Sequence, residues 1–284
     1  MKKWLAGAAW FLAAGVAAGT HAASPEGAAT RVVTLGGSVT EIVYQLGQGG
    51  KLVGDDLSSL YPEAATKLPR VGYYRAVPVE GVLALKPDLV LASEQAGPPD
   101  ALKRLGDVGV RIVTVPDAPS VDSLKARIRN IAEALDVTPA GDALVTEITR
   151  DLKAVEAIPV TGARAILVIN RTGTLQGAGG GTAANEVMTM AGLANVLKDQ
   201  HGYKPLSAEA VSALAPEIIV VTRTSLEASG GVDKLLALPG LASTPAAVRK
   251  RVIVMDDLLL LGMGPRLPLA LTELKREAAG VMGR

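Results

Sequence analysis

The sequence predicts an α/β protein of two Rossmann-like lobes with parallel central sheets, joined by a long bridging helix and separated by a ligand cleft. Three observations support this fold class. Short strands alternate with helices, the strands are apolar almost throughout, and a similar stretch occurs twice, at 70–93 and at 200–222. Near-continuous apolar strands between helices are typical of parallel sheets that are covered on both faces. The repeated stretch indicates that the two lobes are equivalent.

The first lobe is expected at residues 23–119. Residues 31–37 predict a buried strand that ends in a glycine turn, and Ser38 to Glu41 indicate a capping box that opens a helix to about Leu46. Pro87 ends the next helix, and Gly109 ends the one after it. The further strands of this lobe are predicted at 51–56, 88–93 and 111–116, and its further helices at 79–86 and 99–109.

A helical region at 120–160 is expected to join the lobes, and the second lobe follows at 161–284. Ser120 is predicted to cap a helix over 121–135, which 139–158 extends. Gly179 to Gly181 followed by Thr182 predict a turn into a helix, and the lysine of a phosphate loop is missing. The strands of this lobe are predicted at 163–170, 217–222 and 251–257, a turn and helix within 181–197, and a terminal helix at 267–280.

Residues 1–22 have the pattern of a secretory signal peptide. Two lysines precede an apolar run from Trp4 to Ala18, which is short for a membrane span, and cleavage is expected after Ala22. The chain has no cysteine, so an anchor on a lipid-modified cysteine is excluded and no disulfide is needed. We therefore expect a periplasmic protein.

The composition without the signal limits the possible chemistry. Both Trp residues, the one Phe and His21 lie in the signal, which leaves tyrosine as the only aromatic type and His201 as the only histidine. Loss of two lysines moves the formal net charge from +1 to −1, which argues against a nucleic-acid partner. A Cys–His nucleophile pair is impossible, and a zinc or manganese site with several histidines is not expected. Because the usual catalytic motifs are absent as well, we do not expect an enzyme.

The strand ends predict where a ligand binds. Open α/β sheets bind ligands beyond the carboxyl ends of their strands, and two facing lobes would form a cleft there. Residues just past the predicted strand ends should line it, namely Gly36 to Ser38, Ser93 and Glu94, Asn170 and Arg171, Thr222 and Arg223, and the loop after Asp257.

Several motifs together resemble a known family. They are RVVTLGGSVTEIVYQLG, LPRVGYYRAVPVEGVLALKPDLVLAS, TAANEVMTMAGLANV, GYKPLSAEAVSALAPEIIVV and GMGPRLP, and they extend over nearly the whole chain after the signal. On these segments the chain resembles the periplasmic substrate-binding proteins of iron-complex and cobalamin ABC importers, and within them the haem-binding branch. The resemblance implies two lobes bridged by one long helix, haem b (hemin) as the transported ligand, and a permease dimer with ATPase subunits as partner. A monomer is expected.

The resemblance implies that Tyr73, in the GY loop, is the axial ligand of the haem iron. Ferric iron favours an anionic oxygen donor, and tyrosine has a pKa near 10, so a neighbouring cation such as Arg75 would favour the phenolate. Arg75 has a second possible role as the partner of a haem propionate. Tyr74 directly follows Tyr73, so the choice between the two as ligand stays open. The other role of Tyr74 is packing, or stacking on the porphyrin.

The second lobe offers further candidates. Tyr203 is the counterpart of Tyr73, for contact with the ligand or for filling the core. His201 is a possible ligand of a second haem or a solvated loop residue. Arg223 and Arg266 are candidate propionate partners, because a dianionic ligand needs cations, although a loop arginine is usually solvated. Met263 is expected in the apolar lining.

Glu80 and Glu209 form the other symmetric pair. The resemblance implies that each docks into an arginine pocket of one permease subunit, as two separated carboxylates suit a two-fold symmetric partner. The alternative role is an acid stabilised by a helix N-terminus, and the two roles are compatible. The alternative ligands are cobalamin or a ferric siderophore, which Tyr73 with Arg75 and the lack of Trp and Phe disfavour. The number of haems stays open.

Overall fold

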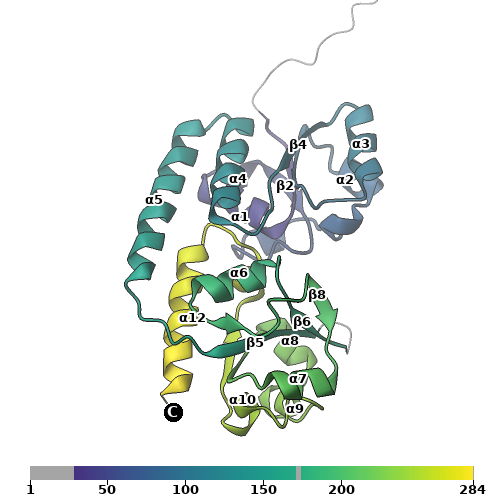
Figure 1. Ribbon diagram of the computed structural model, residues 1–284. Coiled ribbons are helices and arrows are strands. Elements are labelled where there is room, and N and C mark those ends of the chain that lie inside the picture. The colour runs from purple at the N-terminus through teal and green to yellow at the C-terminus, as the bar shows by residue number, and fades with distance from the viewer. Residues whose placement is uncertain (1–28, 171–173, 284) are drawn as a thin grey trace, which may run out of the picture.

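The computed structural model describes residues 29–170 and 174–283, so the predicted signal segment lies outside the described residues. These residues form two α/β lobes, one above the other in Figure 1, with α5 (Thr138–Glu156) running along one side of both. Within the described ranges no helix has the length and apolar character needed to cross a membrane. The two-lobe α/β fold class predicted from the sequence is confirmed.

The first lobe has a four-stranded, all-parallel sheet in the order β2-β1-β3-β4. Its α-helices lie close to where the sequence predicts them, whereas its 3-10 helices were not predicted. An apolar cluster that includes Val33, Val90 and Leu105 belongs to this lobe alone. The strands are β1 (Val32–Leu35), β2 (Leu52–Asp55), β3 (Leu89–Ser93) and β4 (Arg111–Val115), and the helices are α1 (Gly37–Gln45), η1 (Gly49–Lys51), η2 (Ala65–Lys67), η3 (Tyr74–Ala76), α2 (Val79–Ala84) and α3 (Pro99–Asp107).

The helical region between the lobes consists of two helices, α4 (Val121–Ala134) and α5. The Ser120 side chain accepts a hydrogen bond from Ser123 N at 3.1 Å and caps α4 as predicted. Asp136 has a φ of 59°, which breaks the predicted continuous helix. Helix α4 packs against α1 and β4, whereas α5 packs against α4 and against α12 (Leu267–Met282) of the second lobe. Helix α5 therefore makes the connection between the lobes.

The second lobe has a mixed sheet in the order β10-β9-β5-β6-β8, with β7 paired to β5. Strands β10, β9 and β5 are parallel as predicted, whereas β6 is antiparallel to both β5 and β8 and was not predicted. Its strands are β5 (Arg164–Asn170), β6 (Leu175–Ala178), β7 (Ala194–Asn195), β8 (Tyr203–Pro205), β9 (Ile218–Thr222) and β10 (Val252–Met255). Its remaining helices are α6 (Ala183–Met190), α7 (Ala208–Leu214), α8 (Arg223–Ala228), α9 (Val232–Leu236), α10 (Pro245–Val248) and α11 (Asp257–Leu261).

One apolar cluster is continuous between the lobes. It joins residues of α1 and α4 in the first lobe, such as Ile42 and Ile128, to residues of α6 and α12 in the second, such as Val187 and Leu271. These side chains are almost completely buried, and burial of apolar area is the main favourable contribution to folding. The side of the molecule formed by α1, α4, α6 and α12 is therefore filled by apolar packing, and a ligand has to enter from another side.

The repeated stretch has the same order of glycine, tyrosine, short helix and strand in both lobes, although η3 follows the first tyrosine and β8 begins at the second. Gly72 and Gly202 both have a positive φ, 97° and 77°, which glycine adopts without steric cost. Each is followed by a tyrosine, a short helix (α2 or α7) and an inner strand (β3 or β9). Both short helices end at a residue of positive φ, Lys86 at 49° and Ala215 at 43°, immediately before a proline. The predicted equivalence of these two stretches is confirmed at this level.

The predicted capping box at Ser38 is wrong. Helix α1 begins two residues earlier, with Gly36 in place of Ser38 at the cap position, and no side chain caps it. A Cβ on Gly37 would collide with the carbonyl oxygen of Ser58, so glycine allows the close approach of these two segments. The Ser38 hydroxyl instead accepts a hydrogen bond from Arg127, and the Glu41 carboxylate binds Arg266. Both side chains therefore serve contacts between elements rather than the helix end.

Candidate ligand-binding site

A cavity of about 600 Å³ lies between the lobes at the carboxyl ends of the parallel strands. This size is typical of small-molecule sites, which hold roughly 300–1,000 Å³. The first lobe contributes Gly36, Gly37, Ser38, Leu57, Ser58, Leu60, Tyr73, Tyr74, Arg75, Gln95, Asp117 and Pro119. The second lobe contributes Gly181, Thr182, Ala183, Gly202, Tyr203, Thr224, Asp257, Leu258, Leu261, Gly262 and Met263. We call this cavity the interlobe pocket.

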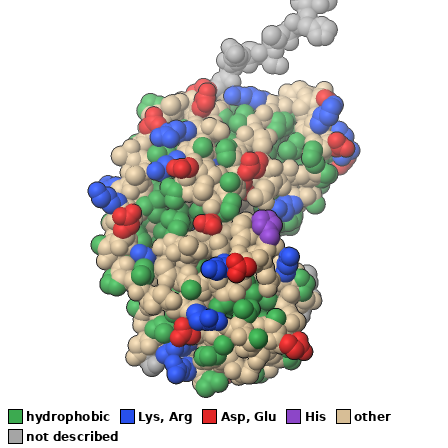
Figure 2. Space-filling model, in the orientation of Figure 1, with side chains coloured by type: hydrophobic (Ala, Val, Ile, Leu, Met, Phe, Trp, Pro, Cys, Tyr) green, Lys and Arg blue, Asp and Glu red, His purple; other side chains and the backbone are tan. Residues whose placement is uncertain are grey.

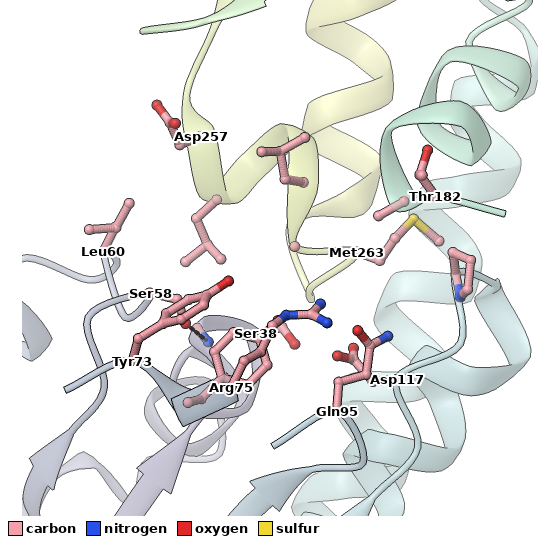
Figure 3. Close-up of a pocket in the computed structure, with 18 of the residues that line it drawn as sticks. Ser38, Ser58, Leu60, Tyr73, Arg75, Gln95, Asp117, Thr182, Asp257 and Met263 are labelled. Atoms are coloured by element: carbon pink, nitrogen blue, oxygen red, sulfur yellow. Dashed lines mark hydrogen bonds between the residues drawn. The ribbon is translucent and has the colours of Figure 1, made fainter. Parts of the chain in front are cut away.

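The GY loop brings Tyr73 and Arg75 into the interlobe pocket from the first lobe (Figure 3), and Tyr74 of the same loop also lines the pocket. Tyr73 has extended backbone angles and a 38% exposed side chain. The two rings meet edge to face, with centroids 4.9 Å apart. Arg75 Nε donates a hydrogen bond to Tyr74 Oη at 3.0 Å, and its guanidinium carbon lies 5.1 Å from the centre of the Tyr74 ring. Tyr74 is therefore held by its neighbours, and Tyr73 is the more accessible of the two.

The electrostatics of the loop disfavour ionisation of Tyr74. Burial raises the pKa of Tyr74 to about 12, and the neighbouring Tyr73 and Asp117 add to this effect, which Arg75 opposes only in part. Burial alone would lower the pKa of Arg75, but the hydroxyls of Tyr74 and Tyr73 outweigh it and raise that pKa. Arg75 therefore stays charged beside both hydroxyls, and ionisation of Tyr74 is disfavoured.

Arg127 lies behind the wall of the interlobe pocket and is completely buried. Its Nη2 is 2.7 Å from Asp117 Oδ1, its Nε donates to Pro116 O at 2.6 Å, and its Nη1 donates to Ser38 Oγ at 2.6 Å. Burial lowers the pKa of Arg127, and the charge of Asp117 opposes this shift. Since Arg127 balances Asp117, Arg75 is the cation that faces the interlobe pocket among its described lining residues.

The second lobe forms an opposing wall with more apolar character. Met263 is 2% exposed and Leu258 is 8% exposed, and Tyr203, at 40%, is about as exposed as Tyr73. In Figure 3, Met263 and Thr182 lie across the cavity from Tyr73 and Leu60. Aliphatic side chains can cover the face of a flat ligand by burying apolar area. The interlobe pocket therefore presents a tyrosine and a cation on one wall and mainly apolar groups on the other.

Three of the predicted site residues are not among those that line the interlobe pocket. Arg223 is exposed at the start of α8, and its neighbour Thr224 lines the cavity instead. His201 is exposed and lies against Gly181, where an added Cβ would meet its ring, so it is placed beside the pocket wall. Arg266 binds the Glu41 carboxylate at 2.9 and 3.0 Å and stacks on the Tyr61 ring, with its guanidinium carbon 3.6 Å from the centroid. Arg266 is therefore held by partners outside the pocket lining, whereas Arg223 is exposed next to a lining residue.

Glu80 and Glu209 lie at equivalent places in the two lobes. Both are exposed, and each lies in the first turn of its short helix, α2 or α7. Figure 2 shows acidic and basic side chains interspersed over the face that it draws, on both lobes, and the outline narrows on one side between the lobes.

The rule of strand ends identified part of the lining. Gly36 to Ser38 and the segment from Asp257 line the interlobe pocket as predicted, whereas Gln95 takes the place of Ser93 and Glu94. The prediction was wrong for Asn170 and Thr222, which are buried and are not among the lining residues. Arg171 lies outside the described residues. The sequence reasoning missed the lining residues that follow the strands β2 and β4, namely Leu57, Ser58, Leu60, Asp117 and Pro119. The same rule applied to these two strands would have found them.

Comparisons with known proteins agree with this architecture. A family model described as periplasmic binding protein matches residues 32–259. The chain is 33% identical over 244 residues to the uncharacterized ABC transporter substrate-binding lipoprotein YvrC of Bacillus subtilis, covering 84% of this chain and 76% of YvrC. It is 28% identical over 261 residues to the vitamin B12-binding protein of Yersinia pestis, covering 90% and 89% of the two chains.

Two solved structures are similar over almost their full length. The periplasmic heme-binding protein BhuT, solved in complex with two hemes, has a TM-score of 0.84 at 42% identity, and the match covers 89% of this chain and 98% of BhuT. The periplasmic heme-binding protein RhuT from Roseiflexus sp. RS-1, solved in apo form, has a TM-score of 0.85 at 38% identity, and the match covers 88% and 98%.

Proposed function

Because the chain belongs to the periplasmic binding protein family, as a substrate-binding protein of an ABC importer, we propose that it captures ferric haem in the interlobe pocket. The iron is held through the phenolate of Tyr73, and the loaded protein delivers haem to a membrane permease. The observation that carries the proposal is the placement of an exposed tyrosine beside a charged arginine, at the wall of a cavity between two lobes. Haem-binding relatives at 38% and 42% identity support the choice of ligand.

The chemistry of the GY loop favours Tyr73 over Tyr74 as the ligand. Ferric iron binds the ionised phenol, so the ligand has to lose its proton at neutral pH. Burial raises the pKa of Tyr74 to about 12, although the charge and the hydrogen bond of Arg75 oppose this shift. Tyr73 lines the interlobe pocket, is 38% exposed and lies beside the same cation. A charged neighbour favours the phenolate electrostatically.

The remaining lining suits a flat macrocycle with a charged edge. Leu258, Leu261 and Met263 cover one face of the ligand by apolar contact, and Tyr203 contacts it from the second lobe. The main role of Arg75 is to stabilise the Tyr73 phenolate. A propionate near the GY loop would bind the same cation. Arg223 is exposed beside the lining residue Thr224 and stays a candidate propionate partner. Arg266 would need to leave Glu41 and Tyr61 to reach a propionate, so we assign it no contact with haem. His201 would need a similar rearrangement to bind a second haem.

Delivery uses the two symmetric glutamates. Glu80 and Glu209 are exposed in the first turns of α2 and α7, so both carboxylates are accessible to a partner. Two rigidly spaced carboxylates suit the two equivalent subunits of a permease dimer. Docking of both glutamates would pull on the two lobes at once, and separation of the lobes would release haem.

The runner-up ligand is cobalamin, because relatives at 28% identity are named vitamin B12-binding proteins. A ferric siderophore is the other alternative within the same fold. Both tryptophans and the phenylalanine precede residue 12, so the aromatic groups that line the interlobe pocket in the described part of the chain are Tyr73, Tyr74 and Tyr203. This tyrosine and arginine lining fits an iron-bound macrocycle better than a corrinoid.

The test is equilibrium binding of the mature protein to three probes, namely hemin, cyanocobalamin and a ferric hydroxamate siderophore. We expect hemin to saturate the protein at a defined stoichiometry while the other two probes show no saturable binding. Saturable binding of cyanocobalamin or of the siderophore in place of hemin would overturn the proposal. A chemical change in bound hemin on repeated turnover would indicate an enzyme instead of a carrier.

A further inference from the structure

The buried carboxylate of Asp56 joins three segments of the pocket wall. Asp56 follows β2, and its side chain is completely buried. The three segments are the turn before α1, the segment 57–60 and the GY loop, and each of them lines the interlobe pocket. The motifs of the family resemblance gave this aspartate no role.

Five hydrogen bonds reach the Asp56 carboxylate. Its Oδ1 accepts from Gly36 N at 3.0 Å, from Ser58 Oγ at 2.9 Å and from Ser59 Oγ at 3.2 Å. Its Oδ2 accepts from Ser58 N at 3.0 Å and from Tyr74 N at 3.2 Å. An ionised carboxylate is an acceptor on both oxygens, with about four lone-pair sites. An asparagine amide would offer one acceptor and would turn its NH₂ group toward donors.

The residues on both sides of Tyr73 are bound to the same short segment. Tyr74 N donates to Asp56 Oδ2, and Leu57 N donates to the carbonyl oxygen of Gly72 at 2.8 Å. Gly72 has a φ of 97°, a conformation that it holds without help from a side chain. The peptide units that flank Tyr73 are thus attached to residues 56 and 57, and these set the direction in which its side chain leaves the loop.

We propose that Asp56 is the positioning residue for the iron ligand: its carboxylate fixes the Tyr73 peptide against the turn before α1, so that the phenol points into the interlobe pocket. The inference rests on the proposed function and deepens it. An iron–oxygen bond depends on the direction of the phenol as well as on its charge, and small misplacements of a positioned group have large effects. Asp56 itself touches neither haem nor iron.

The experiment is a double-mutant cycle between Asp56→Asn and Tyr73→Phe in the mature protein, read by hemin affinity and by the phenolate charge-transfer band of the complex. We expect Asp56→Asn to weaken hemin binding at least about tenfold and to shift or weaken the band when Tyr73 is present. In the Tyr73→Phe background the same substitution should change hemin affinity less than about twofold. Such coupling identifies residues that act through one another.

Asp88→Asn is the matched control, because Asp88 also accepts hydrogen bonds from backbone N–H groups. It binds Thr30 N at 2.9 Å and Arg31 N at 3.1 Å, just before β3 and hence at the opposite end of the sheet from the interlobe pocket. Asp88→Asn should lower the thermal midpoint without any change in hemin affinity or spectrum. Asp56→Asn should lower the midpoint equally with and without Tyr73.

An equal loss of hemin affinity from Asp56→Asn in both backgrounds would overturn the inference, because Asp56 would then support the fold only. If Asp56→Asn does not fold, Asp56→Ser, which keeps one hydroxyl acceptor, carries the same comparison. If the wild type itself shows no hemin binding through Tyr73, the proposed function fails. Additive effects in a protein that does bind through Tyr73 leave that function intact and remove the role of Asp56 alone.

Discussion

Glu41 and Arg266, 225 residues apart in the chain, form a two-point ion pair that joins the lobes behind the interlobe pocket. The two bonds measure 2.9 and 3.0 Å, and the Glu41 side chain is 2% exposed. Burial raises the pKa of Glu41, and the contacts with Arg266 oppose that shift. Arg127 makes a parallel connection, since it donates to Ser38 Oγ of the first lobe and, at 3.4 Å, to Met263 O of the second. The lobes are thus linked by charged side chains as well as by apolar contact.

Loss of the Glu41 carboxylate should destabilise the protein strongly. Glu41→Gln leaves the Arg266 guanidinium largely buried without a counter-ion, and breaking a buried ion pair costs about 3–5 kcal/mol. We expect a loss near the lower end, about 3 kcal/mol, because Arg266 is 16% exposed. Urea unfolding of the wild type and of Glu41→Gln measures this loss in the free energy of unfolding. Asp107→Asn, which breaks the exposed pair with Lys103, is the control and should cost under about 1 kcal/mol. Equal effects of the two substitutions would contradict a linking role for Glu41.

Arg75→Gln should weaken hemin binding through Tyr73 rather than through a propionate. Removal of the cation disfavours the phenolate, and hydrogen bonds to charged groups contribute about 1.5–3 kcal/mol, or about ten- to a hundredfold in affinity. The loss should be similar for hemin and for its dimethyl ester, and the phenolate band should weaken. A loss confined to hemin would assign Arg75 to a propionate instead. Arg104→Gln, on exposed α3, should leave both ligands unaffected.

Asp55 should make the stability of the protein depend on pH. Burial, reinforced by Asp56 and opposed by Arg70, raises the pKa of Asp55 from 3.8 to about 7. Between about pH 4 and 7 the folded chain therefore holds a proton that the unfolded chain releases, so the stabilising contribution is present at low pH and is lost as the pH rises toward 7. The slope of this contribution is at most about 1.4 kcal/mol per pH unit.

Urea unfolding at pH 5, 6.5 and 8 of the wild type and of Asp55→Asn measures this effect. The free energy of unfolding of the wild type relative to the variant should fall as the pH rises, while contributions from other groups, such as Glu41, cancel in the difference. Parallel pH profiles for the two proteins would show that Asp55 does not titrate in this range.

Glu80 and Glu209 should matter for delivery and not for capture. Glu80→Ala and Glu209→Ala should each reduce stimulation of the importer ATPase in proteoliposomes that contain the cognate permease, and the double variant should abolish it. Hemin titrations of all three should match the wild type, because both carboxylates lie outside the interlobe pocket. The control is Glu147→Ala on the exposed side of α5. Full stimulation by the double variant would contradict the docking role.

Local signals in the sequence predicted most of the fold. Strands and helix caps depend mainly on neighbouring residues in the chain. The structure accordingly has the predicted strand at Ile218–Thr222 and helix caps at Ser120 and Thr182. The resemblance to periplasmic haem-binding proteins is confirmed by the similarity to BhuT and RhuT. The antiparallel strands β6 and β8 were missed because they are short, and because β8 is exposed and lacks a pattern of alternation.

Long-range contacts explain why some residues near the site have other roles in the structure than the sequence predicted. The spacing of Ser38 and Glu41 is that of a capping box, but tertiary partners 89 and 225 residues away take both side chains. Because Arg266 binds Glu41, it is not among the residues that line the interlobe pocket. No local pattern around GMGPR could reveal this contact. Tyr73, Tyr74 and Arg75 lie in the pocket wall, where the repeated GY loop led us to expect them. Their assignment as ligand and neighbours stays a prediction.

The most direct test of the account is a hemin titration of the mature wild type, Tyr73→Phe and Tyr74→Phe, followed by absorption spectroscopy. The wild type and Tyr74→Phe should develop the charge-transfer band of high-spin ferric haem bound to a phenolate, and Tyr73→Phe should lose it. Loss of the band in Tyr74→Phe with retention in Tyr73→Phe would contradict the assigned ligand. A wild type that shows only the spectrum of free hemin would contradict haem capture altogether.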